Sequence, residues 1–275
     1  MKTLMDVQEL QDRMTSGAQT ILLDVRWSLG DPHGHEHYRA AHIPGAVYVD
    51  LTTQLCAPGG PGLGRHPLPE ADALQEAARQ WGLNDGDTVV AYDDSGNLAA
   101  ARLWWLLRDA GFSSVSLLDG GLTAWRAAGC DVEDGEEQHC VGNVHLSSGH
   151  MPTVAVPDLL EPAAVDVLLD ARAGERFRGE FEPIDPRAGH VPGAVSAPTS
   201  DNLGDDGRFL PAEELRRRFS ALGADRGSVA VYCGSGITAA HEIAALDIAG
   251  IGASLFPGSW SQWSTTEGLP VATGS

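Results

Sequence analysis

The heptapeptide AHIPGAV at residues 41–47 recurs as GHVPGAV at residues 189–195, and this repetition decides how the rest of the chain is interpreted. Three further pairs of segments match in the same order. They are LLDVR (22–26) with LLDAR (168–172), VVAYD (89–93) with VAVYC (229–233), and SLLDGG (116–121) with SLFPGS (254–259). Four matches in one order predict two copies of one structural unit, whose connecting loops differ in length.

Each half alternates short apolar runs with helical stretches. Residues 88–92 and 228–232 are expected to be strands, and residues 70–81, 99–110 and 211–222 are expected to be helices. Strands that are apolar throughout and separated by helices predict parallel sheets covered on both faces. The expected fold is therefore α/β, with domains at 1–135 and 157–275. Residues 136–156 are acidic and contain glycine without clear periodicity, and they are expected to form the linker.

Composition and charge exclude several classes of protein. The 275 residues include 38 acidic and 18 basic side chains, and the resulting net charge of −20 argues against a nucleic-acid partner. No apolar run is long enough to span a membrane, so no membrane association is expected. The first residues lack the apolar segment of a secretory signal, which predicts a cytoplasmic location. Four cysteines without a CxxC pair predict free thiols rather than a disulfide framework.

Cys233 lies where chemistry is expected in a parallel sheet. It follows the apolar run 228–232 and opens the segment CGSGIT (233–238), which leads into an alanine-rich helical stretch. Two glycines let the backbone N–H groups curl inward, and the helix amino terminus adds positive potential that stabilises a thiolate. A nucleophilic cysteine is expected, and the alternative is a small buried hydrophobic side chain. The first half has Asp93 at this place and so lacks the nucleophile.

Together these segments resemble the tandem-domain rhodanese family of sulfurtransferases over essentially the whole chain. The resemblance implies two rhodanese-like domains, an inactive one at 1–135 and a catalytic one at 157–275. The CGSGIT loop is similar to that of 3-mercaptopyruvate sulfurtransferases, whereas thiosulfate sulfurtransferases typically carry arginine and lysine after the cysteine, where this chain has Gly234 and Ser235. The resemblance therefore implies transfer of sulfur from 3-mercaptopyruvate, through a Cys233 persulfide, to cyanide or a thiol acceptor such as thioredoxin. No cofactor or metal is implied.

The resemblance also implies two sets of site residues. The residues that attack sulfur and handle protons would be Cys233, Ser235, His42 and Asp31, with Glu36 as the alternative acid. The residues that hold the donor and the transferred sulfur would be Arg178, Arg187, Gly234, Gly236, Ile237 and Thr238. For the two arginines, the alternative is a structural ion pair with nearby carboxylates.

The sequence also bears on functions other than sulfur transfer. A cysteine phosphatase usually needs an arginine six positions after the nucleophile, and Ala239 stands there, which argues against phosphate chemistry. Thiosulfate:cyanide sulfur transfer and a non-catalytic rhodanese-like binding module stay open as alternatives. The run HGHEH (33–37) is set aside as a metal site, because no cysteine or second histidine cluster completes it. Residues 59–64 contain no nucleotide-binding motif and are expected to be a loop.

Overall fold

The computed structural model describes residues 2–60, 62–161 and 164–275, which divide into two compact units. Unit 1 comprises Met1–Cys56, Pro69–Met151 and Gly204–Phe209, and unit 2 comprises Ala57–Leu68, Pro152–Leu203 and Leu210–Ser275. The chain passes from one unit to the other within the expected linker. Each unit also takes in a short segment from the opposite half of the sequence, which the sequence did not predict. Among the described residues, no helix is long and apolar enough to cross a membrane.

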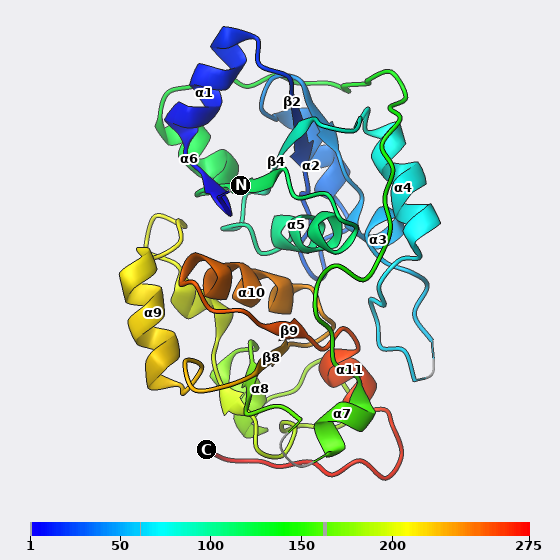
Figure 1. Ribbon diagram of the computed structural model, residues 1–275, viewed down its shortest axis with the longest axis vertical. Coiled ribbons are helices and arrows are strands. Elements are labelled where there is room, and N and C mark those ends of the chain that lie inside the picture. The colour runs from blue at the N-terminus through cyan, green and yellow to red at the C-terminus, as the bar shows by residue number, and fades with distance from the viewer. Residues whose placement is uncertain (1, 61, 162–163) are drawn as a thin grey trace. The chain divides into compact units, whose positions relative to one another are not determined.

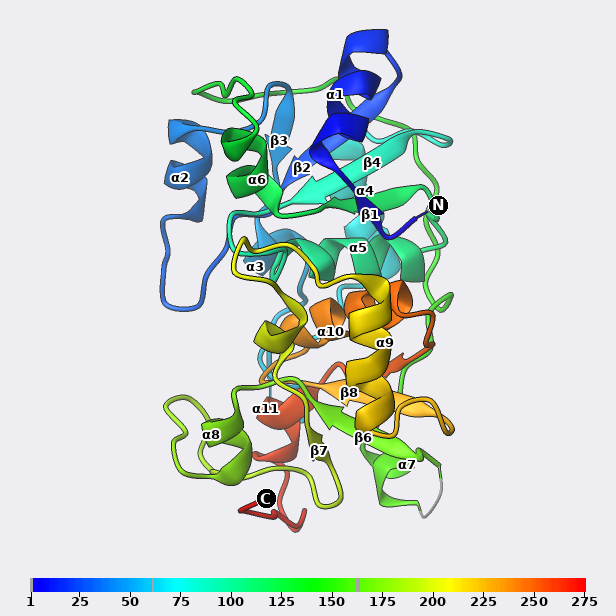
Figure 2. The same cartoon turned by 90° about the vertical axis from the view of Figure 1, so that its left-hand side faces the viewer.

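Unit 1 is built on a parallel sheet with the strand order β1-β5-β4-β2-β3 (Figure 1). Its strands are β1 (Leu4–Met5), β2 (Thr20–Asp24), β3 (Ala46–Tyr48), β4 (Thr88–Tyr92) and β5 (Val115–Leu118). Its helices are α1 (Val7–Ser16), α2 (Gly34–Ala40), α3 (Leu51–Gln54), α4 (Ala71–Gln80), α5 (Ala100–Asp109) and α6 (Gly121–Ala127). Figure 2 shows α1 and α6 on one side of the strands and α5 on the other, so the central strands are apolar because helices cover both faces.

Unit 2 repeats the arrangement with a sheet in the order β7-β6-β8-β9. Its strands are β6 (Val167–Asp170), β7 (Val195–Ser196), β8 (Val229–Tyr232) and β9 (Ser254–Leu255). Its helices are α7 (Val156–Leu160), α8 (Gly174–Arg178), the 3-10 turn η1 (Thr199–Asn202), α9 (Ala212–Ala221), α10 (Thr238–Ile248) and α11 (Ser259–Trp263). One face of the sheet packs against two tryptophans of α11, Trp260 and Trp263, which are both fully buried.

The matching strand orders confirm the α/β fold and the internal repeat. Strands β3-β2-β4-β5 of unit 1 correspond to β7-β6-β8-β9 of unit 2. The three expected helices are present as α4, α5 and α9, each one residue shorter at both ends. The residues that precede α4 and α9, Glu70 and Pro211, have non-helical backbone and occupy the N-cap positions, without a capping hydrogen bond from the side chain.

Candidate active site

Cys233 directly follows β8, and its loop turns into α10 five residues later. The cysteine is 2% exposed, and its Sγ accepts a hydrogen bond from the Gly236 N–H at 3.1 Å. Gly236 has φ +82°, a left-handed conformation that favours glycine, and this turn aims its N–H at the sulfur. A backbone donor and the start of a helix both favour the negatively charged thiolate at this place.

The first turn of α11 holds the Cys233 loop in position. The Cys233 N–H donates to Ser259 Oγ at 3.1 Å, and the carbonyl of Cys233 accepts from the Trp260 N–H at 2.9 Å. The Gly234 carbonyl accepts from the Ser261 N–H at 2.9 Å. Ser259 has φ 52°, a conformation uncommon for a residue with a side chain, and such outliers concentrate at functional sites. The loop is therefore fixed by a neighbouring element as well as by its own strand and helix.

Ser235 has an imidazole partner that the sequence did not predict. Ser235 is 7% exposed, and its Oγ lies 2.8 Å from Nδ1 of His66. His66 belongs to the 57–68 segment of unit 2, shortly after residues 59–64, which were expected to be only a loop. The His66 imidazole can therefore exchange a proton with the serine hydroxyl beside Cys233, in either direction according to its tautomer.

His42, which was expected to act with Ser235, has one ring nitrogen bonded within unit 1. It lies in unit 1 with none of its surface exposed, and its Nδ1 is 3.0 Å from the Tyr38 carbonyl. Its ring stacks on that of Tyr38, with the centroids 4.2 Å apart. Within unit 2, the imidazole that contacts Ser235 is that of His66.

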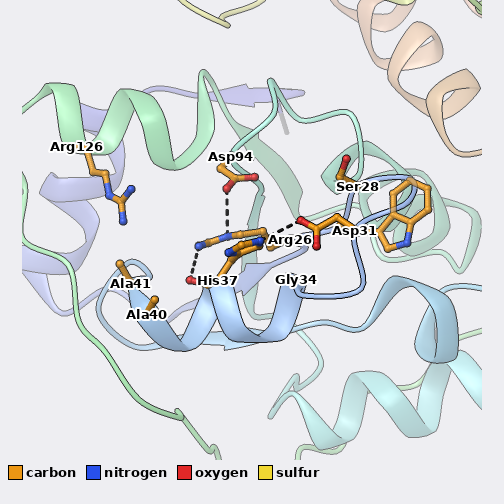
Figure 3. A pocket seen from close by; sticks show the side chains of 10 residues that line it. Arg26, Ser28, Asp31, Gly34, His37, Ala40, Ala41, Asp94 and Arg126 are labelled. Carbon is orange, nitrogen blue, oxygen red and sulfur yellow. Dashed lines mark hydrogen bonds and ion pairs between the residues drawn. The ribbon is translucent and has the colours of Figure 1, made fainter.

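The two acids proposed for His42 also have other partners. Asp31 Oδ2 pairs with His37 Nε2 at 3.0 Å, and Glu36 pairs with His33 Nδ1 at 3.1 Å. Hydrogen bonds from the His33 N–H and the His37 ring lower the pKa of Asp31. Figure 3 shows Asp31 and His37 at a pocket of about 340 Å³ in unit 1, whose lining does not include His42. Neither acid is therefore placed to orient the His42 ring.

Two arginines flank the backbone immediately after the nucleophile. A Cβ atom built on Gly234 would lie 3.2 Å from Nη2 of Arg65 and 3.4 Å from Nη1 of Arg176. A side chain at position 234 would therefore crowd both guanidinium groups, which glycine avoids. Both arginines are within reach of a negatively charged group bound next to Cys233.

Carboxylates hold these guanidinium groups in place. Arg176 Nη2 lies 2.7 Å from Glu182 and 3.3 Å from Asp185, and Arg65 Nη1 also pairs with Asp185. Burial raises the pKa of Asp185 even though Arg65 opposes the change. Burial also acts to raise the pKa of Glu182, but the hydrogen bond and charge of Arg176 and the backbone N–H groups of Asp185 and Ile184 together outweigh it, and the pKa of that carboxyl is lowered. The buried Nε of Arg65 has no hydrogen-bond partner among the described residues.

The two arginines expected from the sequence, Arg178 and Arg187, have partners within the protein. Arg178 is 43% exposed and pairs with Glu180 at 2.8 Å, which is the structural ion pair considered as the alternative. Arg187 binds the end of the chain, and its Nε, Nη1 and Nη2 donate at 2.7 Å to the carbonyl oxygens of Ser264, Leu269 and Trp263. A further bond joins Nη2 to the Thr266 carbonyl at 3.2 Å. Most donors of Arg187 are thus already used.

A cleft of about 600 Å³ lies beside this constellation in unit 2. Its lining includes Arg65, His66 and Asp185, together with Ser261 and Thr265 from α11 and the turn after it. Another wall of the cleft is formed by Gly59, Gly60 and Gly64. The volume suits a small molecule, and the polar groups that would orient it lie next to the Cys233 loop.

Unit 1 has a carboxylate where unit 2 has the nucleophile. Asp93 follows β4 and is fully buried, and its Oδ1 accepts from the N–H groups of Ser95 at 2.8 Å and Asn97 at 2.7 Å. Its Oδ2 accepts from Ala99 at 2.8 Å and Ala100 at 3.1 Å. Burial raises the pKa of Asp93 although these four bonds oppose the rise. The loop in this unit is thus filled by its own side chain.

Comparison with known proteins is consistent with this geometry. The model of the rhodanese-like domain matches residues 6–128 and 155–266. A probable 3-mercaptopyruvate sulfurtransferase of Pseudomonas aeruginosa is 46% identical, over 98% of both chains. A putative thiosulfate sulfurtransferase of Mycobacterium tuberculosis is 44% identical, over 100% of this chain and 98% of the relative. The 3-mercaptopyruvate sulfurtransferase structure from Leishmania major superposes with TM-score 0.84 and 29% identity, over 96% of this chain and 74% of that one.

Proposed function

The chain belongs to the rhodanese-like domain family, and on this premise we propose that it transfers sulfur from 3-mercaptopyruvate, through a persulfide on Cys233, to a thiol or cyanide. The observation that carries the proposal is the Cys233 loop, in which a backbone N–H points at Sγ and a serine–histidine pair stands beside it. The cleft next to this loop is large enough for a three-carbon acid.

In the first step, the Cys233 thiolate attacks the sulfur of the donor and forms an S–S bond. The carbon–sulfur bond breaks, and its electron pair passes to the carbon as the enolate of pyruvate. A proton supplied through Ser235 and His66 converts the enolate to pyruvate, and their 2.8 Å contact makes this pair the proposed proton donor. The carboxylate of the donor is proposed to bind Arg176 and Arg65, whose guanidinium groups adjoin Gly234.

In the second step, an acceptor thiolate attacks the outer sulfur of the persulfide. The S–S bond breaks, the acceptor leaves as its own persulfide, and Cys233 returns to the thiolate. Reduced thioredoxin is the proposed physiological acceptor, and a cytoplasmic location accompanies this proposal. The two half-reactions predict ping-pong kinetics.

Thiosulfate is the second candidate donor, because the Mycobacterium tuberculosis relative is named for it. A doubly charged donor needs cationic side chains close to its sulfonate group. Here the two positions after Cys233 are glycine and serine, and the neighbouring arginines are each paired with a carboxylate. These features favour a donor with one remote negative charge.

The test is turnover with each donor under identical acceptor conditions, repeated with Cys233→Ser. We expect kcat/KM for 3-mercaptopyruvate to exceed that for thiosulfate at least tenfold, and Cys233→Ser to abolish both activities. A preference for thiosulfate would refute the donor assignment but leave the persulfide intact. Full activity in Cys233→Ser would refute the mechanism itself, and absence of activity with every donor would favour the binding-module alternative.

A further inference from the structure

A cluster of one histidine and two glutamates lies in unit 1, apart from the residues assigned to sulfur transfer. One ligand atom each from His42, Glu133 and Glu137 falls within 4.8 Å of the other two. His42 is fully buried, Glu137 is half-buried, and Glu133 is exposed. The cluster joins the loop before β3 to the acidic connector that follows α6.

The His42 ring is held in the tautomer that can bind a metal ion. Its Nδ1 lies 3.0 Å from the Tyr38 carbonyl, which can only accept a hydrogen bond, so Nδ1 carries the proton. In the neutral imidazole, Nε2 then carries the lone pair. This atom is buried and has no hydrogen-bond partner among the described residues. An N–H donating to a backbone carbonyl is the usual way in which proteins orient a metal-binding histidine.

The backbone also fixes the position of both glutamates. His42 and Glu133 exchange two N–H···O=C bonds of 2.9 Å, which places the two residues opposite each other. The Glu137 N–H donates to the Tyr38 hydroxyl at 3.0 Å. The backbones of both glutamates are thus fixed near the His42 ring, and a cation between the three groups would offset the repulsion of the two carboxylates.

Unit 2 provides an internal comparison. His190 is the repeat equivalent of His42, its Nδ1 lies 2.8 Å from the Phe177 carbonyl, and its ring stacks on that of Phe177. His190 exchanges the same pair of backbone bonds with Ala272, at 2.8 and 3.0 Å. Ala272 thus takes the place of Glu133. The orientation of the imidazole belongs to the fold, whereas the glutamate opposite it is specific to unit 1.

We propose that His42, Glu133 and Glu137 bind a divalent transition-metal ion of the zinc type. One imidazole and two carboxylates are ligands that zinc accepts, with water at the fourth position. Ligands about 2.1 Å from a tetrahedral zinc ion lie about 3.4 Å from one another. The ligand atoms here lie within 4.8 Å, so the glutamate side chains must close by up to about 1.4 Å, which exposed Glu133 can do. The ion ties the acidic connector to the His42 loop. This site is distinct from the run 33–37, where His33, His35 and His37 each pair with a carboxylate.

The test is metal binding by the full-length chain after removal of metal with a chelator. Zn²⁺ is titrated in competition with a chromophoric chelator, and Co²⁺ is used as a spectroscopic probe. We expect one Zn²⁺ per chain and a visible Co²⁺ spectrum without a thiolate charge-transfer band. Glu133→Gln and Glu137→Gln should each weaken binding at least tenfold, because even outer-shell partners change metal affinity about 10- to 100-fold. Asp134→Asn, an acid of the same connector outside the cluster, should change it less than about twofold.

His42→Asn should also lose the ion, and since this variant alters a buried residue, the two surface glutamate variants decide the question if it fails to fold. Three results would overturn the proposal. They are no saturable binding up to about 1 mM Zn²⁺, affinity unchanged in both glutamate variants, or a Co²⁺ thiolate band that disappears in Cys140→Ser or Cys233→Ser. Unchanged affinity in the glutamate variants would leave His42 as a core histidine like His190.

Discussion

Replacing Arg176 by alanine distinguishes the arginine that the structure places beside the nucleophile from the one that the sequence pattern favoured. Arg176 lies next to Gly234 and is tied to Glu182 and Asp185, whereas Arg178 pairs with Glu180 in solvent. If Arg176 binds the carboxylate of the donor, Arg176→Ala must impair the first half-reaction, and Arg178→Ala is the matched control.

The expected magnitude follows from the contacts. A hydrogen bond to a charged group contributes about 1.5–3 kcal/mol, so its loss lowers kcat/KM for 3-mercaptopyruvate about 10- to 150-fold. Because the carboxylate is remote from the reacting sulfur, the change should be mainly in KM. Arg176→Ala also leaves Glu182 and Asp185, both 3% exposed, with one cation fewer, and we expect a loss of stability of roughly 1–3 kcal/mol. Arg178→Ala removes an exposed pair, for which the change in stability is about 0–1 kcal/mol.

The assay is pyruvate release as a function of 3-mercaptopyruvate concentration at saturating acceptor, with urea denaturation of the same preparations. Arg176→Lys is included because it keeps the charge but loses the planar group that binds a carboxylate through two bonds, and it should restore activity only in part. A larger rise of KM in Arg178→Ala than in Arg176→Ala would refute the assignment. Equal losses in kcat and stability with unchanged KM would give Arg176 a structural role only.

Three further predictions concern the proton donor, a buried acid and the unit 1 loop. Ser235→Ala and His66→Gln should each lower kcat about 10²- to 10⁴-fold. Because the two groups act together, the double variant should be no slower than either single variant. If the two losses in the rate of pyruvate release multiply in the double variant, the two groups do not act as one unit. Burial raises the pKa of Glu242 from 4.5 to about 7, so the folded chain keeps a proton that the unfolded chain releases, and the free energy of unfolding should fall by roughly 3 kcal/mol as pH rises through this interval. Glu242→Gln should remove that slope in urea denaturation, and an unchanged slope would exclude Glu242 as its source. Asp93→Asn brings an amide group against four backbone N–H donors and should cost about 1–3 kcal/mol in the same measurement, whereas equal stability would mean that the loop rearranges.

The sequence predicts the fold well because its signals are local and occur twice. Apolar strands at 88–92 and 228–232 are each followed by a polar loop residue, and the HxPGA segments fix the correspondence of the two sheets. The position of Cys233 follows from the same pattern, since the residue after a central parallel strand lies at the carboxyl edge of the sheet. These inferences need only the order of residues along one strand and one helix.

The partners of the nucleophile depend on long-range packing, which a single sequence does not reveal. His66 meets Ser235 across 169 positions, from a segment whose glycines and prolines give no periodic signal. Arg176 and Arg178 are separated by about 200° around α8, so only one of them can face the site. Arg178 is the last residue of that helix, before Gly179 in the left-handed conformation, and its side chain turns to Glu180. The sequence pattern favoured Arg178 and did not predict that Arg176 lies beside the loop.

The unit 1 copy of the loop suggests how the Cys233 loop would hold the proposed persulfide. In unit 1, Asp93 extends from the strand end through Cβ, Cγ and Oδ2, and Oδ2 accepts N–H groups at the start of α5. A persulfide on Cys233 extends from the equivalent strand end toward the start of α10. It does so through Cβ, Sγ and an outer sulfur, the same number of atoms as in the Asp93 side chain. Oδ2 of Asp93 therefore stands where the repeat would place the outer sulfur. Because the Asp93 loop supplies four N–H donors to an anion of this reach, the equivalent loop of unit 2 can stabilise the persulfide anion with backbone groups alone. This leaves Arg65 and Arg176 available for the carboxylate of the donor.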